Sequence, residues 1–324
     1  AVELFSVPIS GGTRTMLSGS ITPGGNALDQ FGLGTHFAIS PDSARVVFLG
    51  DLATAGVTEL FSVPITGGAR TTLSGLIVPG GNVFDFLISG NGSTVVFQGD
   101  LSTDNRDELF SVPITGGTRT VLSGAVVPGG GVYRFAIAPN NATVIFGGNI
   151  QSPSTAEIFS VPIGGGTRTT ISGSVVSGGA GTTGVGKFRI SPDGTRVVFS
   201  GYYQSTTLAE LFSVPIGGGS RATLSGTIIA GGDLIDDFEI TADSTRVVFR
   251  GTLQTAGVYD VFSTPIGGGS RTLLSGTTVA GSAGTGGFLL SPDGARVVFV
   301  GDLQTVGKNA LYAVPAAGGT RYRM

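Results

Sequence analysis

The sequence contains no cysteine and no tryptophan, one histidine and only two lysines, Lys187 and Lys308. Without cysteine there can be no disulfide, no thiolate metal site and no cysteine nucleophile. A nucleophilic triad normally needs a histidine base, and His36 is the only histidine. No G-x-S-x-G surrounds a candidate serine. The sequence therefore predicts no catalytic residue, and we expect the protein not to be an enzyme.

Charge and long hydrophobic runs are also scarce. Charged residues make up 12% of the chain, against about 25% in a typical soluble domain. The net charge is −3 and the positive charge is almost all arginine, with no basic stripe. This pattern excludes nucleic acid as an expected partner. No apolar run approaches the roughly 20 residues of a membrane-spanning helix, so we expect no transmembrane segment.

The chain instead consists of two repeated phrases that are rich in glycine. The first reads E-L-F-S-V-P-I-x-G-G-x-R-T-x-L-S-G, and its seven copies are anchored on Phe5, Phe61, Phe110, Phe159, Phe212, Phe262 and Tyr312. The second reads F-x-I-S-P-D-x-x-R-V-V-F-x-G, and its six copies are anchored on Phe48, Phe97, Phe146, Phe199, Phe249 and Phe299. A period of roughly 50 residues with strand-type content indicates a propeller or another array of β modules.

Each repeat unit reads as four short strands, A to D. In the first unit, strand A is expected at 37–40, B at 45–49, C at 59–65 and D at 70–74. The A–B turn, S-P-D-G in its clearest form at 191–194, suits a tight turn because proline presets its first corner and glycine accepts positive φ. The Gly-Gly pairs between C and D suit a hairpin. Strand C has a proline near its end, where the loss of an N–H is tolerated.

Both faces of these strands are apolar, so each small sheet should be covered on both sides by its neighbours. The sequence therefore predicts an all-β, six-bladed β-propeller of four-stranded antiparallel blades over residues 35–324. Residues 1–34 then form a surplus N-terminal C–D hairpin with a long loop. This hairpin could displace the C-terminal hairpin, pair with another molecule, be half of a seventh blade, or mark a fragment of a longer array.

Insertions collect in the D–A loops, and the B–C loops vary most in sequence, so one rim of the ring should be variable. Repeat proteins usually bind on such a face. The residues expected to bind a ligand there are His36, Asp104, Arg106, Asp107, Tyr202, Tyr203, Asp233, Asp236 and Asp237. Tyr202 and Tyr203 could stack on a sugar or dock a partner, or could pack between blades. We expect no cofactor; calcium at the acidic loops is the alternative, although neither cluster has the D-x-D-x-D-G spacing.

The phrases resemble the PD40 repeats of TolB-type propellers and, more loosely, the propellers of prolyl-oligopeptidase-like enzymes. The resemblance rests on Ile39-Ser40-Pro41-Asp42 through Val46-Val47-Phe48 and on Glu59-Leu60-Phe61-Ser62-Val63, and it recurs along the whole chain. It implies a propeller fold. The additional α/β domains of both families have no room here, because the repeats run from Glu3 to Arg321. One fold also serves many functions.

The function expected from these features is that of a non-enzymatic binding scaffold acting through the variable rim, with a protein or glycan ligand. One alternative is a self-assembling subunit of an extracellular filament, built by strand exchange of the surplus hairpin between copies. A second alternative is a propeller-type hydrolase or lyase. The composition and the start at Ala1 favour an extracellular, periplasmic or cell-surface location with a removed leader, or else an excised fragment.

Overall fold

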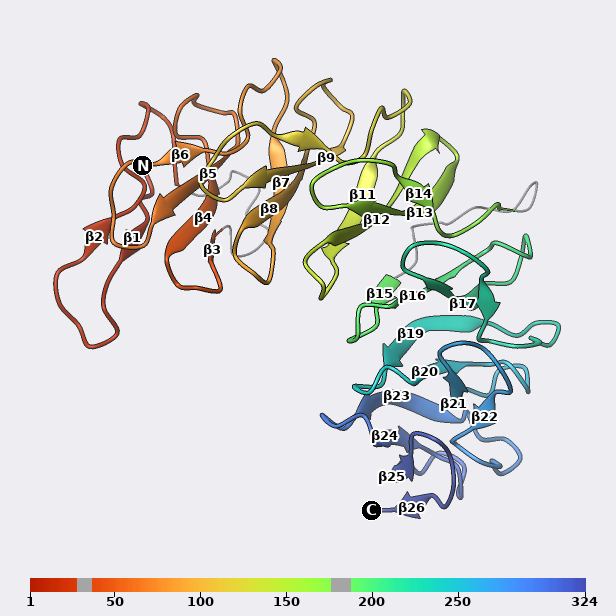
Figure 1. The fold of residues 1–324 in the computed structure, drawn as a ribbon. Coiled ribbons are helices and arrows are strands. Elements are labelled where there is room, and N and C mark those ends of the chain that lie inside the picture. Colours follow the sequence, from red (N-terminus) through yellow and green to blue (C-terminus); the bar gives the residue numbers. More distant parts are fainter. Residues whose placement is uncertain (28–36, 176–187) are drawn as a thin grey trace. The chain divides into compact units, whose positions relative to one another are not determined.

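The computed structural model describes residues 1–27, 37–175 and 188–324. These residues form 26 β-strands and no helix, and they contain no helix of the length and hydrophobicity that crossing a membrane would need. The strands form one two-stranded sheet and six four-stranded sheets (Figure 1). In each four-stranded sheet, consecutive strands are neighbours, and the printed pairs are antiparallel. This is the up-and-down order of propeller blades.

The strand bounds follow the predicted phrases. In the first half of the chain they are β1 (Phe5–Ser6), β2 (Thr15–Met16), β3 (Phe37–Ile39), β4 (Arg45–Gly50), β5 (Glu59–Pro64), β6 (Thr71–Thr72), β7 (Val83–Ile88), β8 (Thr94–Gly99), β9 (Glu108–Pro113), β10 (Thr120–Val121), β11 (Val132–Ile137), β12 (Thr143–Ser152), β13 (Thr155–Pro162) and β14 (Thr169–Thr170). In the second half they are β15 (Phe188–Ile190), β16 (Arg196–Gly201), β17 (Glu210–Pro215), β18 (Ala222–Thr223), β19 (Leu234–Ile240), β20 (Arg246–Gly251), β21 (Asp260–Pro265), β22 (Thr272–Leu273), β23 (Thr285–Leu290), β24 (Arg296–Gly301), β25 (Ala310–Pro315) and β26 (Tyr322–Arg323).

Turn residues fix these strands locally. In the first A–B turn, the Ser40 hydroxyl donates to Asp42 Oδ1 at 2.5 Å and the Ala44 N–H donates to the same oxygen at 3.0 Å. Ser43 then adopts a φ of 58°, a conformation that short polar residues tolerate. In the following C–D turn, Gly67 and Gly68 have φ values of 87° and 120°, which side chains rarely allow. The turn chemistry read from the sequence is therefore the turn chemistry observed.

The chain divides into two compact units, residues 1–153 with 159–168, and residues 154–158 with 169–324. Within the first unit, apolar side chains of adjacent sheets pack together: Leu49 and Leu60 join Val95 and Phe97 in one buried cluster. Within the second unit, Val198 and Leu211 join Val247 and Phe249 in the same way. Within each unit, neighbouring sheets thus cover each other with apolar faces, and the hydrophobic effect holds them together.

The prediction of an all-β fold built from four-stranded antiparallel sheets is confirmed. Six such sheets and the extra N-terminal hairpin β1–β2 are present among the described residues. Strand D is shorter than expected, because only two residues of each predicted segment pair with strand C, as in Phe61↔Thr72 and Ser62↔Thr71. The predicted boundary between residues 1–34 and 35–324 falls within 28–36, outside the described residues.

Candidate functional site

A polar cluster lies at the B–C loop of the β7–β10 sheet, in the first unit. Asp107 is half-buried, and its Oδ2 atom accepts a hydrogen bond from Gln98 Nε2 at 3.3 Å. The same amide donates to the Val132 carbonyl at 2.6 Å. Burial raises the pKa of the Asp107 carboxyl, and Asp100 raises it further. Burial and the charge of Asp107 also raise the pKa of the Tyr133 hydroxyl. The Gln98 amide therefore connects the B–C loop of its own sheet with strand β11 of the next sheet.

The other two candidates of this loop serve local packing. Asp104 is exposed, and its carboxyl lies over Gly80, where an added Cβ would come within 2.9 Å of it. The Arg106 Nη1 atom lies 3.5 Å from the Val126 carbonyl. Gln98 and Tyr133 were missed from the sequence, because both stand at variable positions inside repeat strands. The only signal was that the Gln98 position differs in every copy and the Tyr133 position differs in most of them.

In the second unit, Tyr203 does not form part of an exposed aromatic pair. Its side chain is buried, and its ring makes edge contacts with Phe199 at 5.4 Å and Phe212 at 5.7 Å. Burial raises the pKa of its hydroxyl to about 12. Tyr202 is only half-buried. The Tyr203 ring fills the space beside the phenylalanines of its own sheet, so it does not form an exposed aromatic pair with Tyr202.

The remaining candidates do not form a described site. Asp233 is exposed and Asp237 is half-buried. Burial lowers the pKa of the Arg250 guanidinium, and the nearby charge of Asp237 partly offsets this lowering. His36 and the side chain of Asp236 lie outside the described residues. Across the described part of the chain, no three His, Cys, Asp or Glu side chains are grouped as a metal site would require. The calcium alternative stays a prediction.

Recurrent carboxylates at the ends of B strands connect two loops each. Asp302 accepts hydrogen bonds from the Ser282 hydroxyl at 2.6 Å, the Gly284 N–H at 3.1 Å and the Gly307 N–H at 3.0 Å. Asp51 and Asp100 bind the corresponding two loops of their own repeats. This carboxylate follows the Phe-x-Gly of strand B at Asp51, Asp100 and Asp302. Its recurrence after Phe-x-Gly was the signal for this structural role.

Acid should weaken the loop connection at Asp302. The hydrogen bond from Ser282 and the backbone N–H groups lower the pKa of this carboxyl to about 2. The native state therefore binds the proton more weakly than the unfolded chain, and the stabilisation is present above about pH 4 and is lost as the pH falls toward 2. In urea titrations from pH 5 to pH 2, Asp302→Asn should be less stable than the parent chain at pH 5, and this difference should shrink toward pH 2. A constant difference would contradict the assignment.

The recurrent strand D arginines join neighbouring sheets. Each of the seven guanidinium groups lies 4.4–4.9 Å from the ring centre of its own strand C aromatic residue. In five repeats the Nη1 atom also donates to a serine carbonyl of the preceding repeat, as Arg119 does to Ser74 at 2.5 Å. In these five repeats the arginine therefore connects two neighbouring sheets.

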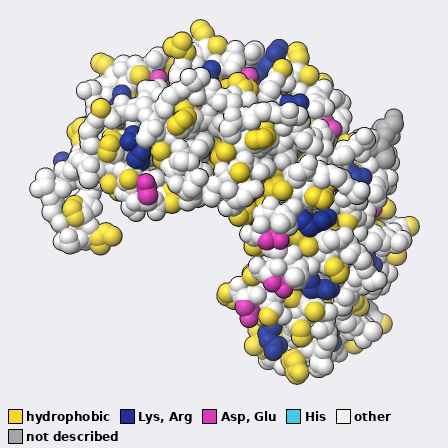
Figure 2. Space-filling model, in the orientation of Figure 1, with side chains coloured by type: hydrophobic (Ala, Val, Ile, Leu, Met, Phe, Trp, Pro, Cys, Tyr) yellow, Lys and Arg dark blue, Asp and Glu magenta, His cyan; other side chains and the backbone are white. Residues whose placement is uncertain are grey.

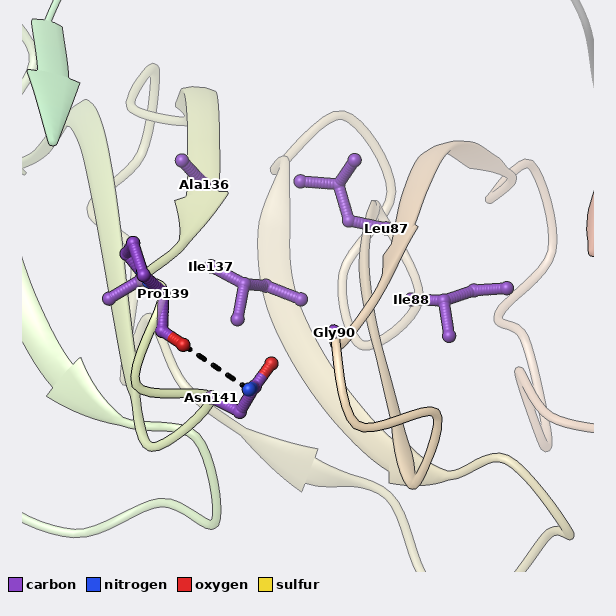
Figure 3. Close-up of a pocket in the computed structure, with 8 residues that line it drawn as sticks. Leu87, Ile88, Gly90, Ala136, Ile137, Pro139 and Asn141 are labelled. Atoms are coloured by element: carbon purple, nitrogen blue, oxygen red, sulfur yellow. Dashed lines mark hydrogen bonds between the residues drawn. The ribbon is translucent and has the colours of Figure 1, made fainter. Parts of the chain in front are cut away.

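An apolar groove of about 400 Å³ lies between the A–B turns of the β7–β10 and β11–β14 sheets (Figure 3). Leu87, Ile88 and Gly90 line one side, and Ile137 and Asn141 are on the other. An added Cβ on Gly90 would come 2.9 Å from Asn141 Oδ1, so any larger residue at position 90 would require the Asn141 side chain to move. None of the lining residues is ionisable, and the groove offers apolar contact rather than acid–base chemistry.

The β1–β2 hairpin is the least complete sheet among the described residues. Leu4 packs against the buried Phe48 and Phe61 of the next sheet, whereas Val7, Ile9 and Met16 are exposed. Figure 2 shows hydrophobic side chains on the surface of this hairpin, at the left of the view. Strand β1 pairs with β2 on one side and, within the described residues, with no strand on the other. An edge of this kind is a template for pairing with another chain.

No protein-family model and no curated protein matches the chain. Solved structures do resemble it. An oligogalacturonate lyase in complex with manganese is 14% identical, with 100% of this chain and 84% of that chain covered and a TM-score of 0.48. A putative TolB from Agrobacterium tumefaciens is 16% identical, with coverages of 74% and 79% and a TM-score of 0.40. The β-propeller domain of the Trilobed protease from Pyrococcus furiosus is 10% identical, with coverages of 99% and 88% and a TM-score of 0.42.

The similar structures agree with the TolB-like propeller resemblance and correct the expected function. Oligogalacturonate lyases and peptidases are among them, which contradicts the prediction of a non-enzymatic binding scaffold acting through the variable rim. The prediction that the chain is not an enzyme is likewise not confirmed. At such low identities the likeness concerns the fold, and it assigns no activity to this chain. The expected extracellular or periplasmic location stays a prediction.

Proposed function

We propose that the chain is a structural repeat protein that associates with further copies of itself, head to tail, through the same contact that joins its sheets. The observation that supports this proposal is a pair of exposed surfaces that are buried at the internal junctions. One is the β24–β25 face of the last sheet. The other is the outer face of the β1–β2 hairpin. The partner in this proposal is another copy of the chain.

The first surface corresponds to residues that are buried elsewhere. At the junction after the β3–β6 sheet, Leu49 is 1% exposed and Leu60 is 0% exposed. Their counterparts in the last sheet are Val300 and Leu311, and each is 39% exposed. Covering apolar area of this kind yields about 25 cal/mol per Å². The face is therefore suited to receive another sheet.

The second surface is the hairpin face that bears Phe5 and Val7. Val7 is 59% exposed, whereas its counterpart Val63 is fully buried. At the internal junctions, the strand C aromatic and valine face the leucine side of the preceding sheet, as Phe110 and Val112 face Leu49 and Leu60. The two exposed surfaces thus differ from each other and are complementary, which is the requirement of a heterologous contact.

Sedimentation velocity of the purified chain tests the proposal. We expect the average mass to rise with protein concentration. Leu311→Lys should block one surface and Val7→Glu the other, so that each variant alone is monomeric. An equimolar mixture should form dimers, since it still contains one intact surface of each kind. Leu76→Lys, at a loop residue that is 92% exposed, is the control and should associate like the parent chain.

Two results would contradict self-association. One is a parent chain that stays monomeric over the whole concentration range. The other is a mixture of Leu311→Lys and Val7→Glu that sediments as monomer only, because the proposed contact would still be available to it. Dimers formed by either variant alone would also exclude the head-to-tail arrangement.

A further inference from the structure

Among the described residues, the β1–β2 hairpin is only half of a four-stranded sheet, because it has a C strand and a D strand but no A or B strand. In the other six sheets, strand C lies between a B strand and a D strand. Strand β1 corresponds to strand C and β2 to strand D, because Phe5↔Met16 repeats the pairing Phe61↔Thr72. The Leu4 carbonyl accepts a hydrogen bond from Leu17 on the β2 side. By alternation along a strand, the backbone groups of Glu3, Phe5 and Val7 point to the opposite, free edge.

The side chain of Ser6 marks the same unoccupied position. Three of its counterparts accept a hydrogen bond from an arginine Nε on the adjacent B strand, each at 2.7 Å: Ser62 from Arg45, Ser213 from Arg196, and Ser263 from Arg246. Ser6 has no B strand beside it among the described residues. Its hydroxyl donates instead to the Ile65 carbonyl at 2.7 Å. An incoming arginine would therefore find a ready acceptor.

The strand A residues of the underlying sheet are uncovered as well. Phe37 is 42% exposed, whereas its five counterparts, Phe86, Phe135, Phe188, Phe238 and Phe288, are 2–9% exposed. At the next junction, Phe86 packs against Val47 and Leu49 of the preceding sheet. Phe37 therefore faces the side on which a preceding sheet would stand. Ile39, also exposed at 53%, lies on the same strand.

We propose that the free edge of β1, together with Phe37 and Ile39, is a docking site for a β-hairpin of the repeat's own A–B type. The incoming B strand would pair with β1 in the register of β4 with β5, where Arg45 opposes Pro64, Phe48 opposes Phe61 and Gly50 opposes Glu59. Its phenylalanine would then oppose Phe5, and its arginine would donate to Ser6. This completes a four-stranded sheet by strand addition. The incoming A strand covers Phe37 and Ile39.

This inference goes beyond the self-association proposed above, because each of the six A–B hairpins described in this chain already pairs with its own strand C. The partner is therefore a segment with an A–B hairpin that lacks its own strand C, and the docking site has its own test. The probe is a fluorescein-labelled peptide of residues 188–201, FRISPDGTRVVFSG, which contains both strands and the S-P-D-G turn. Fluorescence polarisation with the intact 324-residue chain should show saturable binding. A peptide with the same composition in scrambled order should bind at least tenfold more weakly.

Variants of both partners test the register. Val7→Pro removes a backbone donor from the free edge and should abolish binding, and its circular dichroism and thermal unfolding should show that the remaining sheets are folded. Ser6→Ala should weaken the binding of the parent peptide about tenfold, as expected for the loss of a hydrogen bond to a charged group. It should have no further effect on a peptide carrying Arg196→Met, because the two changes remove the same contact.

Three outcomes would overturn the docking site: no binding of the parent peptide, equal binding of the scrambled peptide, or full binding to a folded Val7→Pro chain. These outcomes are independent of sedimentation. A chain that stays monomeric yet binds the peptide would contradict self-association and keep the docking site. A chain that associates but does not bind the peptide would support self-association and contradict the docking site.

Discussion

Replacing Phe97 by alanine should lower the free energy of unfolding by about 3–5 kcal/mol, the usual cost of removing a large buried aromatic side chain. Phe97 is fully buried in strand β8. Its ring stacks on Phe110 with the centroids 5.3 Å apart, and it packs in the cluster shared with the preceding sheet. The substitution would open a cavity inside the blade and at the junction at once. Urea unfolding followed by circular dichroism measures the effect.

The matched control for Phe97→Ala is Phe84→Ala. Phe84 is in the same sheet, in strand β7, but it is 37% exposed. Because much of its ring already contacts water, the same truncation should cost about 1 kcal/mol or less. Equal losses in the two variants would show that the sheet junctions do not dominate the stability of this unit.

Replacing Arg119 by methionine should cost about 2–4 kcal/mol. Its Nη1 atom donates to the carbonyls of Ser74 at 2.5 Å and Leu76 at 2.7 Å, and its guanidinium lies 4.9 Å from the Phe110 ring centre. A hydrogen bond to a charged group contributes about 1.5–3 kcal/mol. Methionine fills similar space but leaves the two carbonyls without this donor. Chemical denaturation of the variant gives the loss directly.

Arg14→Met provides the comparison for this arginine contact. Arg14 lies over Phe5 at 4.5 Å, but its repeat has no preceding sheet among the described residues. Only the cation–π contact would be lost, which contributes about 0.5–1 kcal/mol at an exposed site. A cost for Arg14→Met as large as that for Arg119→Met would mean that the carbonyl contacts between sheets add little.

These effects bear on the two proposals, because both rely on the internal junction as their template. If the apolar faces and the arginine contact hold the sheets together, then the same faces on β24–β25 and on the β1–β2 hairpin should attract a matching sheet. If truncating Phe97 or Arg119 hardly changes the free energy of unfolding, the exposed equivalent surfaces are not expected to attract a further sheet. The stability measurements therefore test the assumption on which both association experiments depend.

The strands and their order were predictable from the sequence. Repetition explains this success, because a residue that recurs in every copy must satisfy a requirement that every copy shares. Arg119 and four of its counterparts connect neighbouring sheets in the same way. The S-P-D-x turns and the Gly-Gly turns were predictable because their hydrogen bonds and positive φ angles depend on residues only a few positions apart.

Positions that differ between repeats could be assigned only from the tertiary structure. Tyr203 looked like part of an exposed doublet, yet it is buried against Phe199 and Phe212. Gln98 and Tyr133 join Asp107 through contacts between two sheets. Whether such a side chain points into a neighbouring sheet or into water depends on the residues opposite it. For Gln98 one of these is Val132, which belongs to the next sheet.

The sequence by itself determined the repeating unit, the four-stranded sheets and the surplus hairpin, because strand periodicity and turn preference are local properties of the chain. Only the tertiary structure decided which surfaces remain uncovered. Phe37 has the same place in its phrase as Phe86. The two differ in exposure because the described residues contain a four-stranded sheet in front of Phe86 but only the two-stranded β1–β2 hairpin in front of Phe37. Burial depends on what packs against a residue in space, and no local pattern records that.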